Sequence, residues 1–447
     1  MGFEKRFLQH RGITVIQKLD PSLPRLRPGK VGIVLAGGAV SGGAFKAGGL
    51  RALDEAFWRR RLPGQTTPKS FGLTNFDVFV GLSAGSVLAS VLSAGIPADE
   101  VFRILHGTSE TYEAFRPWHF MRPNAFEWLS RIGLFFSKEH EFLSNYVSGA
   151  TDWHTGERFT LRATLSKMAQ ATARLVPTGL FDPRALADYL RRNIERSGLS
   201  DDFIESYQRT GKALYLTAAD LNRGELVVFG HDEPYRKVPI SQAIAASCAL
   251  PLWYKPMLID NPLAGEPGEP DRLDLADGGL LRTANVRVAV EKGCELVICY
   301  NPFTRIRYDR AGRSLYEHGL PALMWQATRT LIGARLDMAK ELVYRDDTVQ
   351  ADVVFIEPAE DDYTFFGMNP LNFWSKEAAA SHGYDAVTGA VDANYEMLAQ
   401  LFGCHGIELR PPRGQLMPPP DEEKRAPKLR ESRGQLALTS GKGRDAG

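Results

Sequence analysis

Cysteine is scarce in this sequence. It has four cysteines in 447 residues, and no two of them form a C-x-x-C pair. So few thiols exclude a small scaffold held together by disulfides, and the missing pair leaves a structural zinc site without support. We therefore expect reduced, buried thiols, as in a cytoplasmic protein.

An excess of one charge is also missing, since 54 Lys and Arg stand against 53 Asp and Glu. Without a basic excess, the overall charge does not favour a nucleic acid as the partner. Residues 1–30 are a local exception, because they hold seven basic and two acidic side chains. We interpret them as a basic N-terminal arm that is either solvated or in weak contact with anionic lipid headgroups.

Long apolar runs are nearly absent. Residues 1–30 have no apolar segment of the kind found in secretory signals, so we expect no signal peptide. Residues 78–98 carry no charge and are long enough to cross a bilayer, but Gly, Ser and Pro interrupt them. This pattern indicates a buried strand, a tight turn and a buried helix. We expect no transmembrane helix, and a cytoplasmic protein with at most peripheral membrane contact.

The apolar residues that are present alternate between strand and helix patterns. Residues 31–35 and 77–81 are typical of buried strands, each followed by a helix, at 44–60 and 84–94. This order predicts a three-layer α/β/α fold with a mainly parallel central sheet. Further strands are expected at 214–219, 225–229, 296–300 and 353–356, and long helices at 321–344 and 376–401.

Beyond the arm, the chain divides into three predicted parts: a main domain at 31–301, helices and a strand at 302–410 that complete it, and a tail at 411–447. The tail has six prolines and no aromatic residue, so we expect it to be disordered. Within the main domain, 99–209 is a predicted helical insertion with eight Phe and Trp side chains close together. These are either core residues, or a lid or wall of an acyl-chain pocket.

The segment Gly81-Leu82-Ser83-Ala84-Gly85 matches G-x-S-x-G where a predicted strand meets a predicted helix. A nucleophile elbow needs this context, because the sharp turn lifts the serine hydroxyl off the sheet. Flanking glycines leave room for close packing, and the helix N-terminus stabilises developing negative charge. The alternative is a packing turn that happens to hold a small residue.

A glycine-rich loop, residues 36–43, follows the first predicted strand of the main domain. Its backbone N–H groups are suited to bind an oxyanion or a phosphate. A dinucleotide-binding loop would need an acidic residue about twenty positions on, after a second strand. Asp54 and Glu55 lie in a predicted helix instead, and no G-K-[ST] follows to make a P-loop. An oxyanion-binding loop is favoured, because Ser83 lies one helix and one strand downstream.

Asp277 ends a short alternating strand and precedes Gly278 and Gly279. Such an aspartate is often only a turn residue. Its functional interpretation is a general base whose carboxylate lies beside Ser83.

These three segments, in this order, resemble the patatin-like phospholipases. Residues 245–251 are similar to the A-S-x-A-x-P segment that precedes the family's D-G-G motif, and 214–224 are similar to the strand and turn before it. The resemblance covers roughly residues 31–301. Two departures are visible. The loop opens with Ala36, has no Arg or Lys up to Phe45 and is one residue longer, and Thr283 and Asn285 replace the family's N-x-P.

The resemblance implies a lipid acyl-ester hydrolase of phospholipase or lysophospholipase type with a Ser–Asp dyad and no metal or organic cofactor. Ser83 would be the nucleophile and Asp277 the base, with a carboxyl pKa raised by burial from its usual value of about 3.9. The water-labile intermediate would be an acyl-enzyme. The implied oxyanion-hole residues are Gly37, Gly38, Ala39 and Ala84, and the implied motif-supporting residues are Gly81, Gly85, Gly278 and Gly279.

Two alternatives remain open. One is an ordinary α/β-hydrolase esterase with a Ser-His-Asp triad, in which His318, His382 or His405 would be the base. Only two predicted strands precede Ser83, fewer than such folds place before the elbow. The other is a catalytically weak protein that keeps the fold as a lipid-binding surface.

Overall fold

A computed structural model describes residues 5–20, 29–62, 65, 67–131, 177–303, 314–359, 361–368 and 372–412 of the chain. One unit spans Met1–Arg410 and a second spans Pro411–Gly447. The predicted disordered tail lies outside the described residues apart from its first two positions. The same holds for Phe135, Phe136 and Phe142 of the aromatic cluster.

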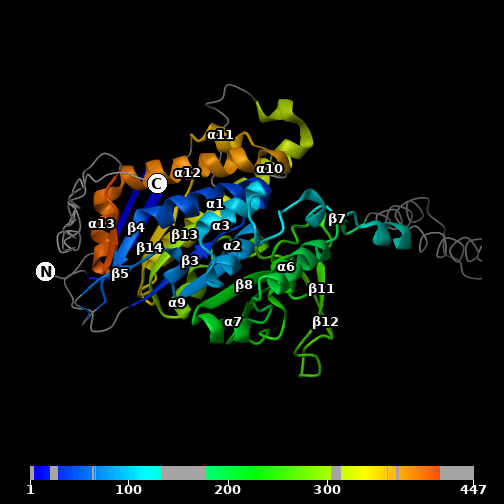
Figure 1. The fold of residues 1–447 in the computed structure, drawn as a ribbon. Coiled ribbons are helices and arrows are strands. Elements are labelled where there is room, and N and C mark those ends of the chain that lie inside the picture. The colour runs from blue at the N-terminus through cyan, green and yellow to red at the C-terminus, as the bar shows by residue number, and fades with distance from the viewer. Residues whose placement is uncertain are drawn as a thin grey trace, which may run out of the picture. The chain divides into compact units, whose positions relative to one another are not determined.

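The strands are short and the helices of moderate length, apart from α10 (Figure 1). The strands are β1 Arg6–His10, β2 Ile13–Gln17, β3 Lys30–Leu35, β4 Phe57–Arg60, β5 Lys69–Ser70, β6 Val78–Leu82, β7 Gly179–Phe181, β8 Ala213–Asp220, β9 Glu225–Gly230, β10 Leu252–Tyr254, β11 Met257–Asp260, β12 Arg272–Asp277, β13 Cys294–Tyr300, β14 Asp352–Ile356 and β15 Ile407–Leu409. The helices are α1 Ala39–Ala56, α2 Ala84–Ser93, α3 Ala98–His106, α6 Arg184–Arg196, α7 Phe203–Thr210, α8 Ile240–Ser247, α9 Val286–Glu291, α10 Gly319–Arg345, α11 Tyr363–Phe366, α12 Lys376–Ala393 and α13 Tyr395–Cys404.

A ten-stranded sheet runs through the described part of the chain in the order β1-β2-β14-β13-β3-β6-β8-β12-β11, with β9 paired to β8. The central pairs from β14 to β8 are parallel. Antiparallel strands lie on both flanks, because β2 pairs with β14 and β12 pairs with β8. The predicted mainly parallel sheet is therefore confirmed at its centre.

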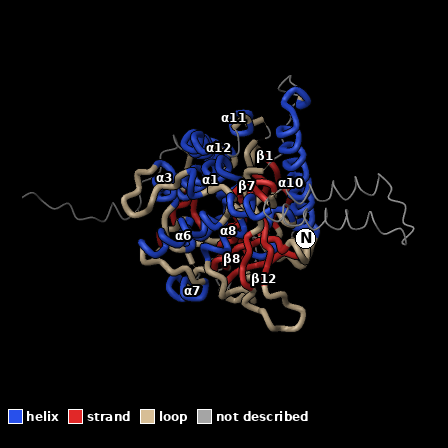
Figure 2. The backbone as a smooth tube through the Cα atoms, turned by 90° about the vertical axis from the view of Figure 1, so that its right-hand side faces the viewer, coloured by secondary structure: helices blue, strands red, loops and turns tan. Residues whose placement is uncertain are grey.

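Side chains alternate between the two faces of this sheet, which explains the three layers. Along β3, Ile33 and Leu35 join the core cluster beneath α1 and α2, whereas Val34 joins a second cluster with α9 and α10. Residues buried on both faces are typical of parallel strands covered by helices on each side. Figure 2 shows the strands surrounded by helices. The three-layer α/β/α prediction is confirmed.

Helix α1 crosses α12 closely, and the two lie side by side in Figure 1. A Cβ atom on Gly48 would overlap the carbonyl of Ala380, and one on Gly383 would overlap the carbonyl of Phe45. Only glycine permits this approach, which holds α1 against the C-terminal part of the domain. This packing holds α1 in place, and the N-terminus of α1 is part of the candidate site described below.

Part of the predicted basic arm is instead part of the sheet. Strand β1 is exposed, but β2 is buried over all five residues and pairs with β14. The prediction of a solvated arm is therefore wrong for Ile13–Gln17. Charge counting missed the short β-branched run of β2, which covers an edge that β14 would otherwise expose.

Residues 78–98 form β6, α2 and the start of α3, as the interrupted apolar pattern predicts. Within the described ranges, no helix is both long enough and apolar enough to cross a bilayer. Helix α1 differs from the prediction, because it begins at Ala39, five residues earlier than expected, and ends before β4. The predicted helix at 376–401 is two helices, α12 and α13, that meet at Asn394.

Candidate active site

Ser83 occupies the turn between β6 and α2. Its backbone has φ 53° and ψ −129°, an unusual conformation for a residue with a Cβ atom. Two hydrogen bonds hold the turn. The Ser86 N–H donates to the Ser83 carbonyl at 2.7 Å, and the Ser83 N–H donates to Ser247 Oγ at 2.8 Å. Strained backbone of this kind persists where the surroundings enforce it, commonly at functional sites.

The glycines that flank Ser83 bring the end of β3 against the elbow. A Cβ atom on Gly85 would overlap the Leu35 carbonyl, and one on Gly81 would lie 2.5 Å from Ser86 Cα. The loop that follows β3 must therefore pass directly beside Ser83. This contact explains why both flanking positions of the motif need glycine.

Asp277 ends β12, and strand register brings it near Ser83. Leu82 pairs with Thr217 on β8, and the next β8 residue, Ala218, pairs with Asp277 on the other side. Ser83 and Asp277 therefore flank the same strand at adjacent levels. The Asp277 side chain is 5% exposed, and its Oδ1 accepts a hydrogen bond from the Gly279 N–H at 2.9 Å.

The electrostatics of Asp277 suit a base. Burial raises the pKa of its carboxyl group to about 6, although hydrogen bonds from Ser83 and Gly279 and the charge of Lys46 favour the ionised form. A carboxylate with this pKa accepts a proton more readily than an exposed aspartate, and it is still ionised at neutral pH. The serine hydroxyl therefore lies close enough to the carboxylate to favour its ionised form.

The glycine-rich loop lies against this pair. A Cβ atom on Gly37 would sit 3.3 Å from Ser83 Cβ and 3.8 Å from Ser83 Oγ. The N–H groups of Gly37 and Gly38 donate no hydrogen bond to any described residue. Ala39, with φ 49°, starts α1, so its N–H is one of the free donors of a helix N-terminus. Gly37, Ala39 and Ala84 line the cavity described next, whereas Gly38 does not.

Ser83 and Asp277 open into a cavity of about 510 Å³. Most of the lining side chains are apolar and come from helices on several sides: Val40 of α1, Val87 of α2, Leu105 of α3, Leu186 of α6, Ile244 of α8 and Leu331 of α10. This volume lies in the usual range for small-molecule sites. Of the predicted aromatic cluster, Phe115 and Phe120 line the cavity, whereas Trp118 and Phe126 are exposed.

Lys46 is a site residue that the sequence analysis missed. It lies on α1, is 0% exposed, and its Nζ donates hydrogen bonds to the carbonyls of Ala36 and Gly37, the latter at 3.2 Å. Burial lowers the pKa of its ammonium group to about 7, although the nearby carboxylate of Asp277 raises it. The available signal was a lysine inside an otherwise apolar stretch of a helix predicted to pack on the sheet.

Cys248 also approaches the site, with its Sγ 3.8 Å from Ser86 Oγ. Burial raises the pKa of this thiol to about 12. The thiolate is the nucleophilic form of cysteine. Cys248 therefore stays protonated at neutral pH, the form in which a thiol is a poor nucleophile.

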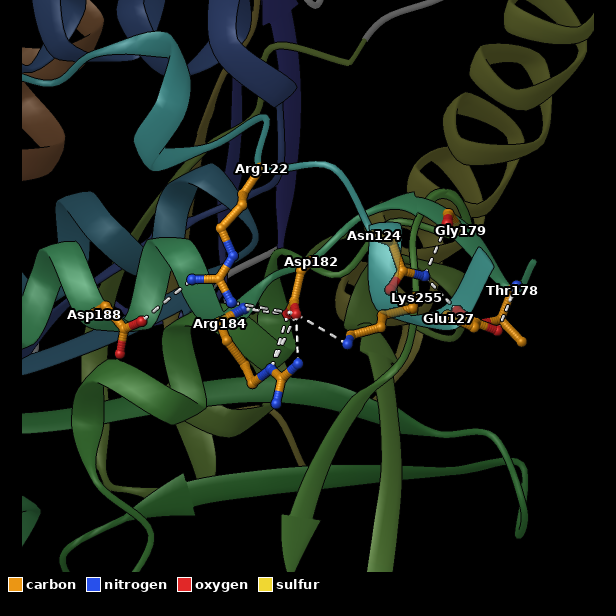
Figure 3. A network of polar contacts seen from close by, with 9 residues as sticks. All are labelled: Arg122, Asn124, Glu127, Thr178, Gly179, Asp182, Arg184, Asp188 and Lys255. Atoms are coloured by element: carbon orange, nitrogen blue, oxygen red, sulfur yellow. Dashed lines mark hydrogen bonds and ion pairs between the residues drawn. The ribbon is translucent and has the colours of Figure 1, made fainter. Parts of the chain in front are cut away.

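A second polar cluster gathers around Asp182, and Figure 3 shows its contacts. Asp182 is buried and pairs with Arg184 at 2.6 Å, Lys255 at 2.9 Å and Arg122 at 3.6 Å. Burial raises the pKa of the Asp182 carboxyl group. Hydrogen bonds from Arg184 and Lys255 outweigh this effect and hold the pKa well below its usual range. The cluster ties the start of α6 to the end of β10, whose Tyr254 lines the cavity. Each of the three cations has Asp182 as an ion-pair partner, so we assign the cluster a structural role.

The histidines of the alternative triad lie in other pairs. His382 Nε2 is 2.7 Å from Asp362 Oδ1, and His405 Nε2 is 2.8 Å from Asp352 Oδ2. Asp352 begins β14, whereas Ser83 follows the C-terminal end of a strand that runs in the same direction. His405 therefore lies at the opposite end of the parallel strands from Ser83. The side chain of His318 lies outside the described residues. Within the described part of the chain, no three His, Cys, Asp or Glu side chains cluster as a metal site would require.

The described residues thus combine a three-layer α/β/α fold, a serine at a strand-to-helix turn and an apolar cavity beside that serine. The family model "Patatin-like phospholipase" matches residues 33–290, and the chain belongs to that family. No curated protein matches the chain in sequence.

Three solved structures are similar to the chain. VipD from Legionella pneumophila is 17% identical with a TM-score of 0.32, over 87% of this chain and 70% of VipD. Human GIVD cytosolic phospholipase A2 is 10% identical with a TM-score of 0.41, over 85% of this chain and 60% of that protein. The type III effector protein ExoU is 15% identical with a TM-score of 0.29, over 90% of this chain and 63% of ExoU.

Proposed function

We propose that this chain hydrolyses acyl esters of lipids, as a phospholipase or lysophospholipase, with Ser83 as nucleophile and Asp277 as its base. Membership of the patatin-like phospholipases supports lipid acyl-ester hydrolysis. The observation that carries the proposal is that Ser83 and Asp277 lie at neighbouring positions around β8 and both line one apolar cavity.

The first half-reaction forms an acyl-enzyme. Ser83 Oγ attacks the ester carbonyl carbon while Asp277 takes the hydroxyl proton. The tetrahedral intermediate then breaks its bond to the alcohol portion of the lipid. That alcohol leaves with the proton held by Asp277, and the acyl group stays on Ser83.

The second half-reaction repeats these roles with water. Asp277 accepts a proton from water, the hydroxide oxygen attacks the acyl carbon, and the bond to Ser83 Oγ breaks. The proton returns to Ser83, and a fatty acid leaves. No metal or organic cofactor enters either step.

The negative charge on the tetrahedral intermediate needs donors that are in place beforehand. We assign this role to backbone N–H groups of Gly37, Gly38 and Ala39, together with that of Ala84. Two helix N-termini support the assignment, since α1 begins at Ala39 and α2 begins at Ala84. The positive ends of both helices favour an oxyanion beside Ser83.

Hydrolysis of a total lipid extract tests the proposed function and identifies the substrate. Purified wild type should deplete one class of acyl lipid and release an equal amount of fatty acid, because the apolar cavity accommodates an acyl chain. Ser83→Ala serves as the blank. A wild-type protein that co-purifies with lipid but depletes none would instead support the lipid-binding alternative.

Peripheral contact with anionic membranes is a second part of the proposal. Arg6 and Arg11 are exposed around β1, beside Phe7 and Leu8, which are 41% and 43% exposed. A basic residue near an anionic surface contributes about 1 kcal/mol, and the contribution is screened by salt.

We expect the protein to sediment with anionic vesicles at low salt, less so at high salt, and less so when Arg6 and Arg11 are both replaced by Gln. The double variant should keep its activity on a soluble ester. Equal sedimentation with neutral and anionic vesicles at low salt would argue against this contact.

A further inference from the structure

The glycine-rich loop, residues 36–43, contains no basic residue, yet a basic group reaches it from α1. Lys46 lies two turns into α1, and its side chain returns toward the start of the helix, the direction in which helix side chains lean. The ammonium group ends beneath the loop, where it contacts the carbonyls of Ala36 and Gly37.

These two carbonyls belong to the peptide units that carry the N–H groups of Gly37 and Gly38. A trans peptide is planar and points its C=O and N–H in opposite directions, and the described chain has no cis peptide bond. Because Lys46 holds both carbonyls on its own side, both N–H groups must point away from it. Neither N–H has an acceptor among the described residues, and Gly37 lies directly against Ser83.

We propose that Lys46 is a positioning residue that fixes these two peptide units so that the N–H groups of Gly37 and Gly38 receive the oxyanion. The inference rests on the proposed function and extends it to a residue outside the family's motifs. An ammonium donor also polarises each peptide unit that it bonds, which makes the N–H at the other end a stronger donor.

Burial of the ammonium group supports this role. A fully buried lysine is unfavourable unless charges and hydrogen bonds compensate it. Here the compensation comes from two loop carbonyls and from the carboxylate of Asp277. The loop carbonyls and the Asp277 carboxylate all belong to the candidate site. The buried ammonium group of Lys46 is therefore stabilised by the groups to which we assign the reaction.

Lys18 provides a matched control. It is 8% exposed, and its Nζ also donates to two main-chain carbonyls, those of Val343 and Asp346. Its backbone N–H donates to Asp352, the first residue of β14. Lys18 therefore lies at the N-terminal end of the parallel strands, opposite the end that holds Ser83. Lys18→Met therefore removes a similar interaction far from the site.

The experiment compares Lys46→Met, Lys46→Arg and Lys18→Met on one chromogenic acyl ester, with rates normalised to the fraction of Ser83 that a fluorophosphonate labels. For Lys46→Met we expect kcat to fall about 10- to 100-fold with little change in KM, by analogy with the loss of an oxyanion donor. Lys46→Arg keeps donors to the carbonyls and should recover part of the loss. Lys18→Met should keep kcat within about twofold.

The pH profile separates positioning from a purely structural role. The titratable groups that act on Lys46 are the thiol of Cys248 after α8, the carboxyl of Asp277 on β12 and the thiol of Cys299 on β13. The two thiols stay protonated, because burial raises the pKa of Cys248 to about 12 and that of Cys299 further. Wild-type activity should therefore decline above pH 7 as Lys46 loses its proton, and Lys46→Arg should abolish this decline.

Wild-type kcat in Lys46→Met, or an equal loss in Lys18→Met, would overturn the role of Lys46 while leaving the proposed function in place. If Lys46→Met does not fold, an unchanged alkaline decline in Lys46→Arg overturns it. A wild-type protein that hydrolyses no ester, or a fully active Ser83→Ala, would overturn the proposed function and this inference together.

Discussion

Replacing Ser83 with alanine is expected to lower ester hydrolysis by several powers of ten and leave the fold intact. The substitution removes the only proposed nucleophile, and loss of a catalytic serine reduces turnover to background. The strained turn is held by backbone hydrogen bonds to Ser86 and Ser247, which alanine preserves. Hydrolysis of a chromogenic ester and a thermal melt measure the two effects.

A fluorophosphonate probe gives a direct test of the nucleophile. Mass spectrometry should locate the label on Ser83 in wild type and find none in Ser83→Ala. Ser90→Ala is a suitable control, because Ser90 lies two turns further along α2 and its hydroxyl bonds to the Val87 carbonyl at 2.8 Å. Labelling of another serine, or full activity in Ser83→Ala, would show that the assignment is wrong.

Replacing Asp277 with asparagine should give a loss of similar size for a different reason. Asparagine is nearly isosteric, and its oxygen still accepts the hydrogen bond from the Gly279 N–H. It does not accept the serine proton, so turnover should fall by several powers of ten. KM should change much less, because the shape of the cavity stays the same.

The pH dependence of wild type follows from the same carboxylate. Only ionised Asp277 accepts a proton, and burial raises its pKa to about 6. Activity should therefore rise with pH through about 6, and the residual activity of Asp277→Asn should lack this rise. The carboxyl pKa is higher in the folded protein than in the unfolded chain. Ionised Asp277 therefore destabilises the fold once the pH rises above the pKa of the unfolded chain. At pH 8, Asp277→Asn should melt at the wild-type temperature or higher.

Three histidine variants distinguish the dyad from a triad. Gln at position 318, 382 or 405 should leave most of the activity, since His382 and His405 bond to Asp362 and Asp352. His405→Gln should lower the melting temperature, because it breaks a fully buried pair. Near-complete loss of activity in a well-folded histidine variant would instead favour a Ser-His-Asp triad.

The sequence predicted the fold class and the family because both depend on local patterns. Apolar runs of strand length, each followed by a helix, predict the three layers, and this prediction does not depend on which strands are neighbours in the sheet. The G-x-S-x-G segment likewise contains its own turn, so Ser83 at the end of β6 needed no information about distant residues. For Asp277, the sequence left a turn residue and a base beside Ser83 as alternatives, and the resemblance favoured the base.

Contacts between distant segments were beyond reach of the sequence. The apposition of Ser83 and Asp277 depends on the antiparallel pairing of β12 with β8, and no local pattern gives that register. The role of Lys46 depends on the early start of α1 at Ala39, which turns its side chain back toward the loop. The short strand β2 was missed because the composition of residues 1–30 is dominated by charged residues. Strand pairing depends instead on the apolar, β-branched residues of β2.

The polarity of the central strands gives the domain two functionally separate rims. At one rim, carboxylates accept hydrogen bonds from the protein: Asp77 accepts from the Val31 N–H at 2.8 Å, and the buried Asp352 accepts from Lys18 and His405. At the other rim, the donors beside Ser83 have no acceptor in the described chain. Substitutions at the first rim should therefore alter folding without altering substrate choice. Those at the second can change specificity while the scaffold persists, so the two traits are free to diverge independently during evolution.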